Sequence, residues 1–100
     1  MGMDIFSIAR TGLDASSRKL EVSAENIANL ETDGYKAKQV TNTTDPSGGV
    51  KSSEVKVTDE PTNVAQETIN QIVASTTYKA NAQVVKTAED ISGALFDIKA

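Results

Sequence analysis

The chain has 100 residues, which suits one small domain that buries only a modest share of its surface when it folds alone. Its net charge of -4 argues against a nucleic-acid partner, because no cluster of basic residues is longer than Arg18-Lys19. The sequence contains neither cysteine nor histidine, so disulfides, thiolate metal sites and the commonest general base are excluded. We therefore expect no enzyme, no cofactor and no metal site.

The N-terminal segment, MGMDIFSIARTGLDASS, has neither a basic n-region nor a continuous apolar run. A signal peptide needs both features, and a membrane span needs a longer apolar stretch. We expect no cleaved export signal and no direct membrane insertion.

In the first third of the chain, apolar residues recur every seven positions, which keeps one face of a helix on a seam. Small residues occupy the companion positions and would allow a partner helix to approach closely. The pattern predicts an N-terminal helix over residues 4–31, roughly 40 Å long at 1.5 Å per residue. Its predicted seam residues are Phe6, Leu13, Leu20 and Leu30.

The last third of the chain carries the strongest periodicity, with apolar residues at steps of three and four. Pro61, followed by Thr62 or Asn63 as the N-cap, predicts a helix over residues 63–98. We expect Ile91 to face the first helix near Leu13. Further apolar residues off the stripe predict a second contact surface. The seam residues predicted on this helix are Ile69, Val73, Val84, Ile91, Leu95 and Ile98.

Between the helices, residues 35–60 are rich in Thr, Ser, Lys and Val around the turn-forming segment DPSGG. This composition predicts a β-hairpin with strands near 35–43 and 50–58. The predicted fold class is mainly α: two long amphipathic terminal helices form an antiparallel hairpin or coiled coil, with a short β-hairpin between them. We expect residues 1–100 to form a single rod-like domain.

The segment SAENIANLETDGYK, residues 23–36, places two asparagines in the last turns of the first helix, where asparagine is unfavourable. Helix capping is one explanation, and Asp33-Gly34 suits a left-handed turn, so we expect Gly34 at positive φ. The segment also resembles the N-terminal signature of the flagellar rod and hook family. The residues that carry this resemblance are Ser23, Ala24, Asn26, Ile27, Ala28, Asn29, Thr32, Gly34, Tyr35 and Lys36.

A second resemblance to the same family lies in the C-terminal half, NVAQETINQIVASTTYKANAQ, and includes Tyr78, Ala80 and Asn81. The layout is most similar to proximal-rod subunits. Members of the family usually place a larger β-rich domain between the terminal helices, whereas roughly 26 residues join them here. The chain therefore resembles a near-minimal member with a short middle segment.

The resemblance implies a structural subunit of the bacterial flagellar basal-body rod, which self-assembles through its terminal helices. Its implied partners are copies of itself, other rod and hook subunits and the flagellar type III export apparatus. Its implied location is the rod that spans the periplasm. The resemblance further implies that Asn26, Asn29 and Asn81 hydrogen-bond across helices or to the backbone at the strand junction, and that Tyr35 and Tyr78 are amphipathic anchors.

A different class of function stays open on residue patterns alone. The chain could be a non-flagellar helical hairpin that serves as an adaptor or a chaperone-like protein for a partner helix. Open-ended self-association would favour a rod subunit, and a fixed stoichiometry would favour an adaptor. A hydrolase that uses carboxylates is a further alternative, but this sequence lacks a paired-acid motif in a glycine-rich or metal-binding context.

Overall fold

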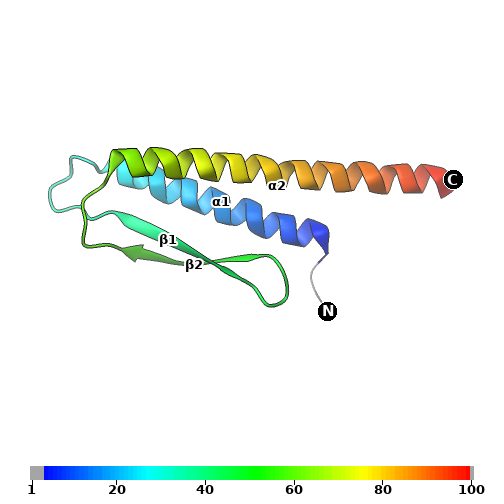
Figure 1. Ribbon diagram of the computed structural model, residues 1–100, viewed down its shortest axis with the longest axis horizontal. Helices are drawn as coiled ribbons and strands as arrows, with labels where there is room; N and C mark the ends of the chain where they lie inside the picture. The colour runs from blue at the N-terminus through cyan, green and yellow to red at the C-terminus, as the bar shows by residue number, and fades with distance from the viewer. Residues whose placement is uncertain (1–3, 100) are drawn as a thin grey trace.

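The computed structural model describes residues 4–99, except for the side chains of residues 52–54 and 96–99. Helix α1 (Ile5–Ala28) is followed by strands β1 (Lys38–Thr44) and β2 (Val50–Val57), and helix α2 (Val64–Lys99) ends the described chain. The two helices are antiparallel, and α1 lies between α2 and the β-hairpin (Figure 1). The molecule is a flat rod of 63 × 25 × 14 Å. The predicted fold class is confirmed.

Side-chain caps fix where both helices begin. Asp4 is the N-cap of α1, and its carboxylate accepts the backbone N–H of Ser7 at 2.8 Å. This hydrogen bond lowers the pKa of Asp4 below its ordinary value. Asn63 caps α2 in the same way, accepting the backbone N–H of Gln66 at 3.1 Å. Helix α1 ends earlier than the predicted limit of residue 31, with Asn29 as its C-cap.

The hairpin is a two-stranded antiparallel ribbon with a bulge between Thr41 and Asn42. Its tip docks on α1 through Thr11, whose hydroxyl accepts the backbone N–H of Val50 at 2.9 Å and donates to the Ile8 carbonyl at 2.6 Å. Gly49 has φ +86°, and a Cβ there would lie 2.5 Å from the Thr11 hydroxyl. Glycine is therefore required at this close approach.

The contact between α1 and α2 is built from small and polar residues. On α1 the buried residues are Ala9, Gly12, Ala15, Ser16, Val22, Ser23 and Asn26, and on α2 they are Glu67 and Ala74. A Cβ on Gly12 would lie 2.6 Å from the Asn81 side chain, which shows how closely the two helices approach. Such a contact brings the backbones together and leaves little room for large side chains between them.

The predicted seam is therefore wrong as a description of the contact within one chain. Phe6 and Leu30 are exposed on α1, and Leu13 and Leu20 are only half-buried. The stripe on α2 is also exposed: Ile69, Val73, Val84, Ile91 and Leu95. Ile98 lies outside the described side chains. The physical reason is that Gly12 and its small neighbours hold the helices too close for these larger residues to pack between them.

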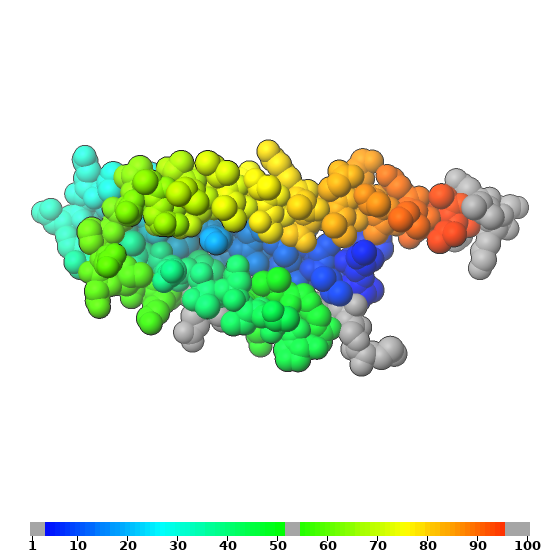
Figure 2. All heavy atoms as spheres, viewed as in Figure 1, coloured from blue at the N-terminus to red at the C-terminus, as the bar shows by residue number. Residues whose placement is uncertain are grey.

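The expected position of Ile91 opposite Leu13 is also wrong. Ile91 lies beside Ile5 and Phe6 at the start of α1, whereas Leu13 shares a surface depression with Val85. Helix α2 is longer than α1 and projects beyond it (Figures 1 and 2). Among residues 4–99, no other helix lies beside the C-terminal turns of α2.

We expect Gly12→Ala to lower the free energy of unfolding by about 1 kcal/mol, because the new methyl group overlaps the Asn81 amide. Gly93→Ala is the matched control, since a Cβ on Gly93 meets no atom within 4 Å. The control should gain up to about 1 kcal/mol from helix propensity alone. Urea unfolding followed by circular dichroism measures both values. An equal gain in the two variants would contradict the close approach at Gly12.

Candidate functional site

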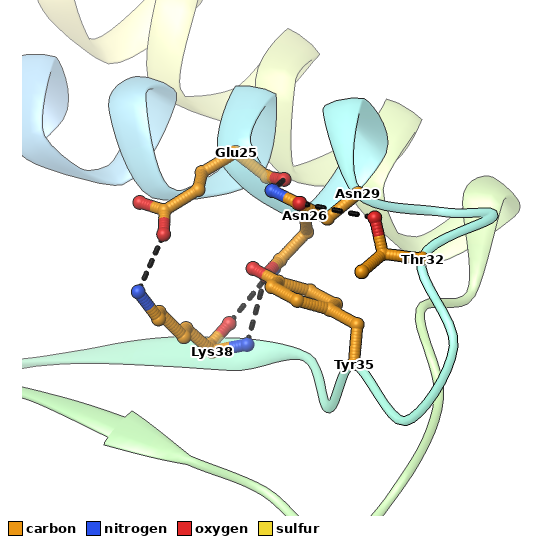
Figure 3. A network of polar contacts seen from close by, with 6 residues as sticks. All are labelled: Glu25, Asn26, Asn29, Thr32, Tyr35 and Lys38. Carbon is orange, nitrogen blue, oxygen red and sulfur yellow. Dashed lines mark hydrogen bonds and ion pairs between the residues drawn. The ribbon is translucent and has the colours of Figure 1, made fainter.

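The C-terminal end of α1 carries a polar cluster around Asn26, whose side chain is 0% exposed. We call it the Asn26 network; its members are Glu25, Asn26, Asn29, Thr32, Tyr35, Lys38 and Glu67, of which Figure 3 draws all but the last. The residues come from α1, the following turn, β1 and the first turn of α2. The network therefore joins both helices and the first strand at one point.

The Asn26 amide pairs with the backbone of Lys38 as a neighbouring strand would. Its oxygen accepts the Lys38 N–H at 2.8 Å, and its NH₂ group donates to the Lys38 carbonyl at 2.9 Å. The oxygen also accepts the Tyr35 hydroxyl at 3.0 Å (Figure 3). Asn26 therefore sets where the chain enters β1, which answers why a poor helix former occupies the last turns of α1.

The second proton of the Asn26 NH₂ group goes to α2. It is donated to the Glu67 carboxylate at 3.0 Å, so the two donors and both acceptor positions of the amide are all used. Glu67 is only 6% exposed, and its backbone carbonyl accepts the Ser23 hydroxyl at 3.1 Å. Its place in the first turn of α2 favours a negative charge. These contacts fix the start of α2 against the end of α1.

Two outer members of the network support the turn. Lys38 forms an ion pair with Glu25, and this hydrogen bond and charge raise the pKa of Lys38 above its ordinary value (Figure 3). Asn29 donates to the Glu25 carbonyl at 3.0 Å and accepts the Thr32 hydroxyl at 3.2 Å. Asn29 thus caps its own helix, and the expectation that it bonds across helices or to the strand junction is wrong.

The turn after α1 depends on Gly34, which has φ +74° as expected. The left-handed conformation is strained for residues with a Cβ, although the surrounding space is open. The backbone N–H of Tyr35 donates to the Thr32 carbonyl at 3.1 Å and closes the turn. Gly34 therefore directs Tyr35 toward Asn26.

The other motif residues are spread over the surface and the helix contact. Ser23 is buried and Ile27 is half-buried, while Ala24, Ala28, Thr32 and Lys36 are exposed. Ala80 and Tyr78 are exposed on α2. The Asn81 amide donates to the Thr77 carbonyl of its own helix at 3.0 Å, so the expectation of a bond across helices is wrong there as well.

The main members that the sequence analysis missed are Glu67 and Lys38. In the sequence, Glu67 lies in the first turn of the predicted helix, just after the candidate cap Asn63. An acid at this spacing indicates the start of a helix and gives no sign of a contact with Asn26. Lys38 takes part chiefly through its backbone, for which the sequence carries no signal.

The second candidate feature is the apolar face of α2. We call Ile69, Val73, Val84, Ile91 and Leu95 the α2 stripe; these side chains are between 39% and 60% exposed. From Ile69 to Leu95 the stripe runs for about 39 Å at 1.5 Å per residue. An apolar row of this length, interrupted only at Thr77 and Ala80, is typical of a surface that binds another helix.

Neither feature has the geometry of a reaction centre. Among the side chains that the structure describes, no group of three or more Asp or Glu is placed to hold a metal ion. No helix within residues 4–99 is long and apolar enough to cross a membrane. The Asn26 network fixes the relative positions of the helices and β1, and the α2 stripe presents an apolar helix face.

Both ends of the chain match known families. Residues 6–36 match the family described as flagella basal body rod protein. Residues 61–98 match the family described as flagellar basal body rod FlgEFG protein C-terminal. The segment between the two matches contains the β-hairpin.

Whole-length relatives agree with these matches. The chain is 33% identical over 122 residues to the flagellar basal-body rod protein FlgC of Salmonella typhimurium strain LT2. It is 31% identical over 122 residues to the protein of that name from Escherichia coli O157:H7, and 30% over 124 residues to that from Buchnera aphidicola of Acyrthosiphon pisum. Each comparison covers 89% of this chain and 91% of the relative. The aligned lengths exceed 100 residues, so the relatives carry residues that this chain lacks.

We expect Asn26→Asp to lower the free energy of unfolding by about 2–4 kcal/mol. The change keeps the size of the side chain but turns its two donors into acceptors, which then face the Lys38 carbonyl and the Glu67 carboxylate. Asn29→Asp makes the same chemical change at a more exposed position and should cost less. Urea unfolding of both variants tests the network, and equal losses would contradict it.

We expect Gly34→Val to cost about 1–3 kcal/mol, because a branched Cβ is strained at positive φ. Gly34→Asn is the control, since asparagine tolerates the left-handed region better. Thermal unfolding compares the two variants. A valine variant as stable as the asparagine variant would mean that backbone strain at residue 34 is unimportant.

Proposed function

The chain belongs to the flagellar basal-body rod protein family, and from that premise we propose that it is a structural subunit that packs into the rod through the α2 stripe. In this role it assembles with copies of itself and with other rod and hook subunits. The observation that carries the proposal is the stripe itself, which the chain leaves exposed along most of α2. A rod subunit uses such a face by burying it against its neighbours.

The shape of the molecule supports a packing role. Helix α1 is covered by α2 on one side and by the hairpin on the other (Figure 1). The small residues between the helices are already used, whereas the largest aliphatic side chains of α2 are not. Burying an aliphatic side chain of this size contributes about 1.5–3 kcal/mol. Association therefore recovers hydrophobic stabilisation that the monomer lacks.

The short middle segment distinguishes this subunit from the relatives to which it is similar. The Asn26 network needs only the turn, the first residues of β1 and the start of α2, so it tolerates a middle segment of different length. We infer that the hairpin replaces a larger outer part and that the paired helices perform the packing.

Delivery to the rod follows from the same assignment. We propose that the chain leaves the cytoplasm through the flagellar export apparatus and takes its place in the part of the rod that spans the periplasm. A chain without cysteine cannot form disulfides after export, and the Asn26 network is held by hydrogen bonds and one ion pair. Purified basal bodies from the source bacterium should contain the protein, and its absence from them would contradict the assignment.

An adaptor that binds one partner helix would also use an exposed stripe, but family membership favours the rod subunit. The two functions differ in stoichiometry. A rod subunit associates without a fixed end point, whereas an adaptor saturates. Sedimentation at increasing protein concentration separates them.

We expect Ile91→Asp to block assembly, because a carboxylate in the α2 stripe must be desolvated against an apolar neighbour. The concentration needed for assembly should rise by at least about tenfold, equivalent to about 1.4 kcal/mol. Unfolding of the monomer should change by less than about 0.5 kcal/mol, because Ile91 is 56% exposed.

Ala82→Asp is the matched control for Ile91→Asp. Ala82 is exposed on α2, and its substitution by Asp adds the same charge. Nine residues, about 2.5 turns, separate Ala82 from Ile91, so the two lie on opposite sides of the helix. Equal effects of the two variants on assembly would show that net charge, and not the stripe, was responsible.

A further inference from the structure

The turn after α1 contains an Asp-Gly pair, Asp33-Gly34, and no other aspartate or asparagine of the chain precedes a glycine. An aspartate in this position can close a succinimide ring with the nitrogen of the following glycine, because glycine has no Cβ to hinder the approach. The reaction needs a carboxyl group that can turn and a backbone N–H that is not engaged elsewhere.

Both reacting groups are free in the structure. Asp33 is exposed, and its carboxylate makes no hydrogen bond or ion pair with the residues that the structure describes. The Gly34 N–H likewise has no acceptor among those residues. The space around Gly34 is open, since a Cβ there would meet nothing within 4 Å. The carboxyl group can therefore rotate toward the Gly34 nitrogen without breaking a contact.

Asp45, in the hairpin turn, lacks both of these freedoms. Its carboxylate accepts the backbone N–H of Ser47 at 2.9 Å. The next residue is Pro46, whose nitrogen carries no hydrogen and cannot close the ring. Asp33 is therefore the more reactive of the two exposed turn aspartates.

The Asp33-Gly34 turn positions a member of the Asn26 network. The Thr32 carbonyl accepts the Tyr35 N–H at 3.1 Å across the turn, and the Tyr35 hydroxyl donates to the Asn26 amide oxygen at 3.0 Å. Figure 3 shows the Tyr35 ring pointing back from the turn toward Asn26. Isoaspartate at residue 33 would add one atom to the main chain between Thr32 and Tyr35, so the turn could not close with the same geometry.

We propose that Asp33 is a site of spontaneous isomerisation to isoaspartate, and that the change releases Tyr35 from the Asn26 network. The Gly34 nitrogen attacks the side-chain carbonyl carbon of Asp33; a C–N bond forms, a carboxyl C–O bond breaks, and one water leaves with the proton of the nitrogen. Water then cleaves the original peptide C–N bond between Asp33 and Gly34. The main chain now runs through the former side chain, and Cα carries a free carboxylate. The two steps release and consume one water and need no other reactant.

Ageing the full-length protein in mildly acidic buffer at physiological temperature tests the site. Mass spectrometry of the tryptic peptide of residues 20–36 should show isoaspartate accumulating at residue 33. Asp33→Asn should accumulate it faster, because an amide loses ammonia through the same ring. Asp33→Glu is the matched control, since its longer side chain would have to close a larger ring, and this variant should give none.

Hydrogen exchange tests the link to the network. In the isomerised protein, separated by chromatography, the Asn26 side-chain amide should exchange roughly tenfold faster than in fresh protein, the factor expected for one lost hydrogen bond. The Asn81 side-chain amide, which donates to the Thr77 carbonyl on α2, is the internal control and should exchange at an unchanged rate.

Three results would overturn the inference. A folded protein that forms no isoaspartate, while a synthetic peptide of residues 28–38 does, would mean that the fold protects Asp33. An equal yield in the Asp33→Glu variant would place the reaction at another residue. An isomerised protein with unchanged exchange at Asn26 would disconnect the turn from the network. None of these measurements depends on assembly, so the rod assignment stands or falls separately.

Discussion

The structure depends on one interaction, the pairing of the Asn26 amide with the backbone of Lys38 and the carboxylate of Glu67. A single buried side chain on α1 bonds to groups from the following turn, β1 and α2, and every hydrogen-bonding position of that side chain is occupied. In a small domain with a thin apolar core, such a network specifies the arrangement of the elements. The hairpin direction, the start of α2 and the antiparallel pairing all follow from it.

The Asn26 network also affects how the two helices pack. Asn26 and Ser23 hold the start of α2 close to α1, and the helix contact is made by small residues such as Gly12 and Ala74 together with polar ones such as Glu67 and Asn81. The larger aliphatic residues of α2 are excluded from the contact and form an exposed stripe. The close approach of the two helices therefore accounts both for the small and polar residues between them and for the apolar side chains left on the surface. A subunit built in this way has a defined shape before it meets its neighbours.

The two helices differ in length, so the two ends of the molecule differ. Helix α2 continues past the start of α1, and an apolar groove lies between the first turn of α1 and the facing part of α2. The short hairpin packs on α1, and its described strands do not pack on α2, so the hairpin leaves the exposed face of α2 uncovered.

The sequence by itself determined the two helices, the hairpin, an N-cap at Thr62 or Asn63, the turn at Gly34 and the family. These features are local, since periodicity, caps and positive φ are encoded within a few residues. The sequence did not determine which face of α2 meets α1. The apolar stripe is the stronger pattern, but the contact instead uses Glu67, Ala74 and Asn81, because Gly12 allows the backbones to approach. Only the tertiary structure joined Lys38 and Glu67 to Asn26, since these residues are brought together by the turn and the helix pairing and share no local pattern.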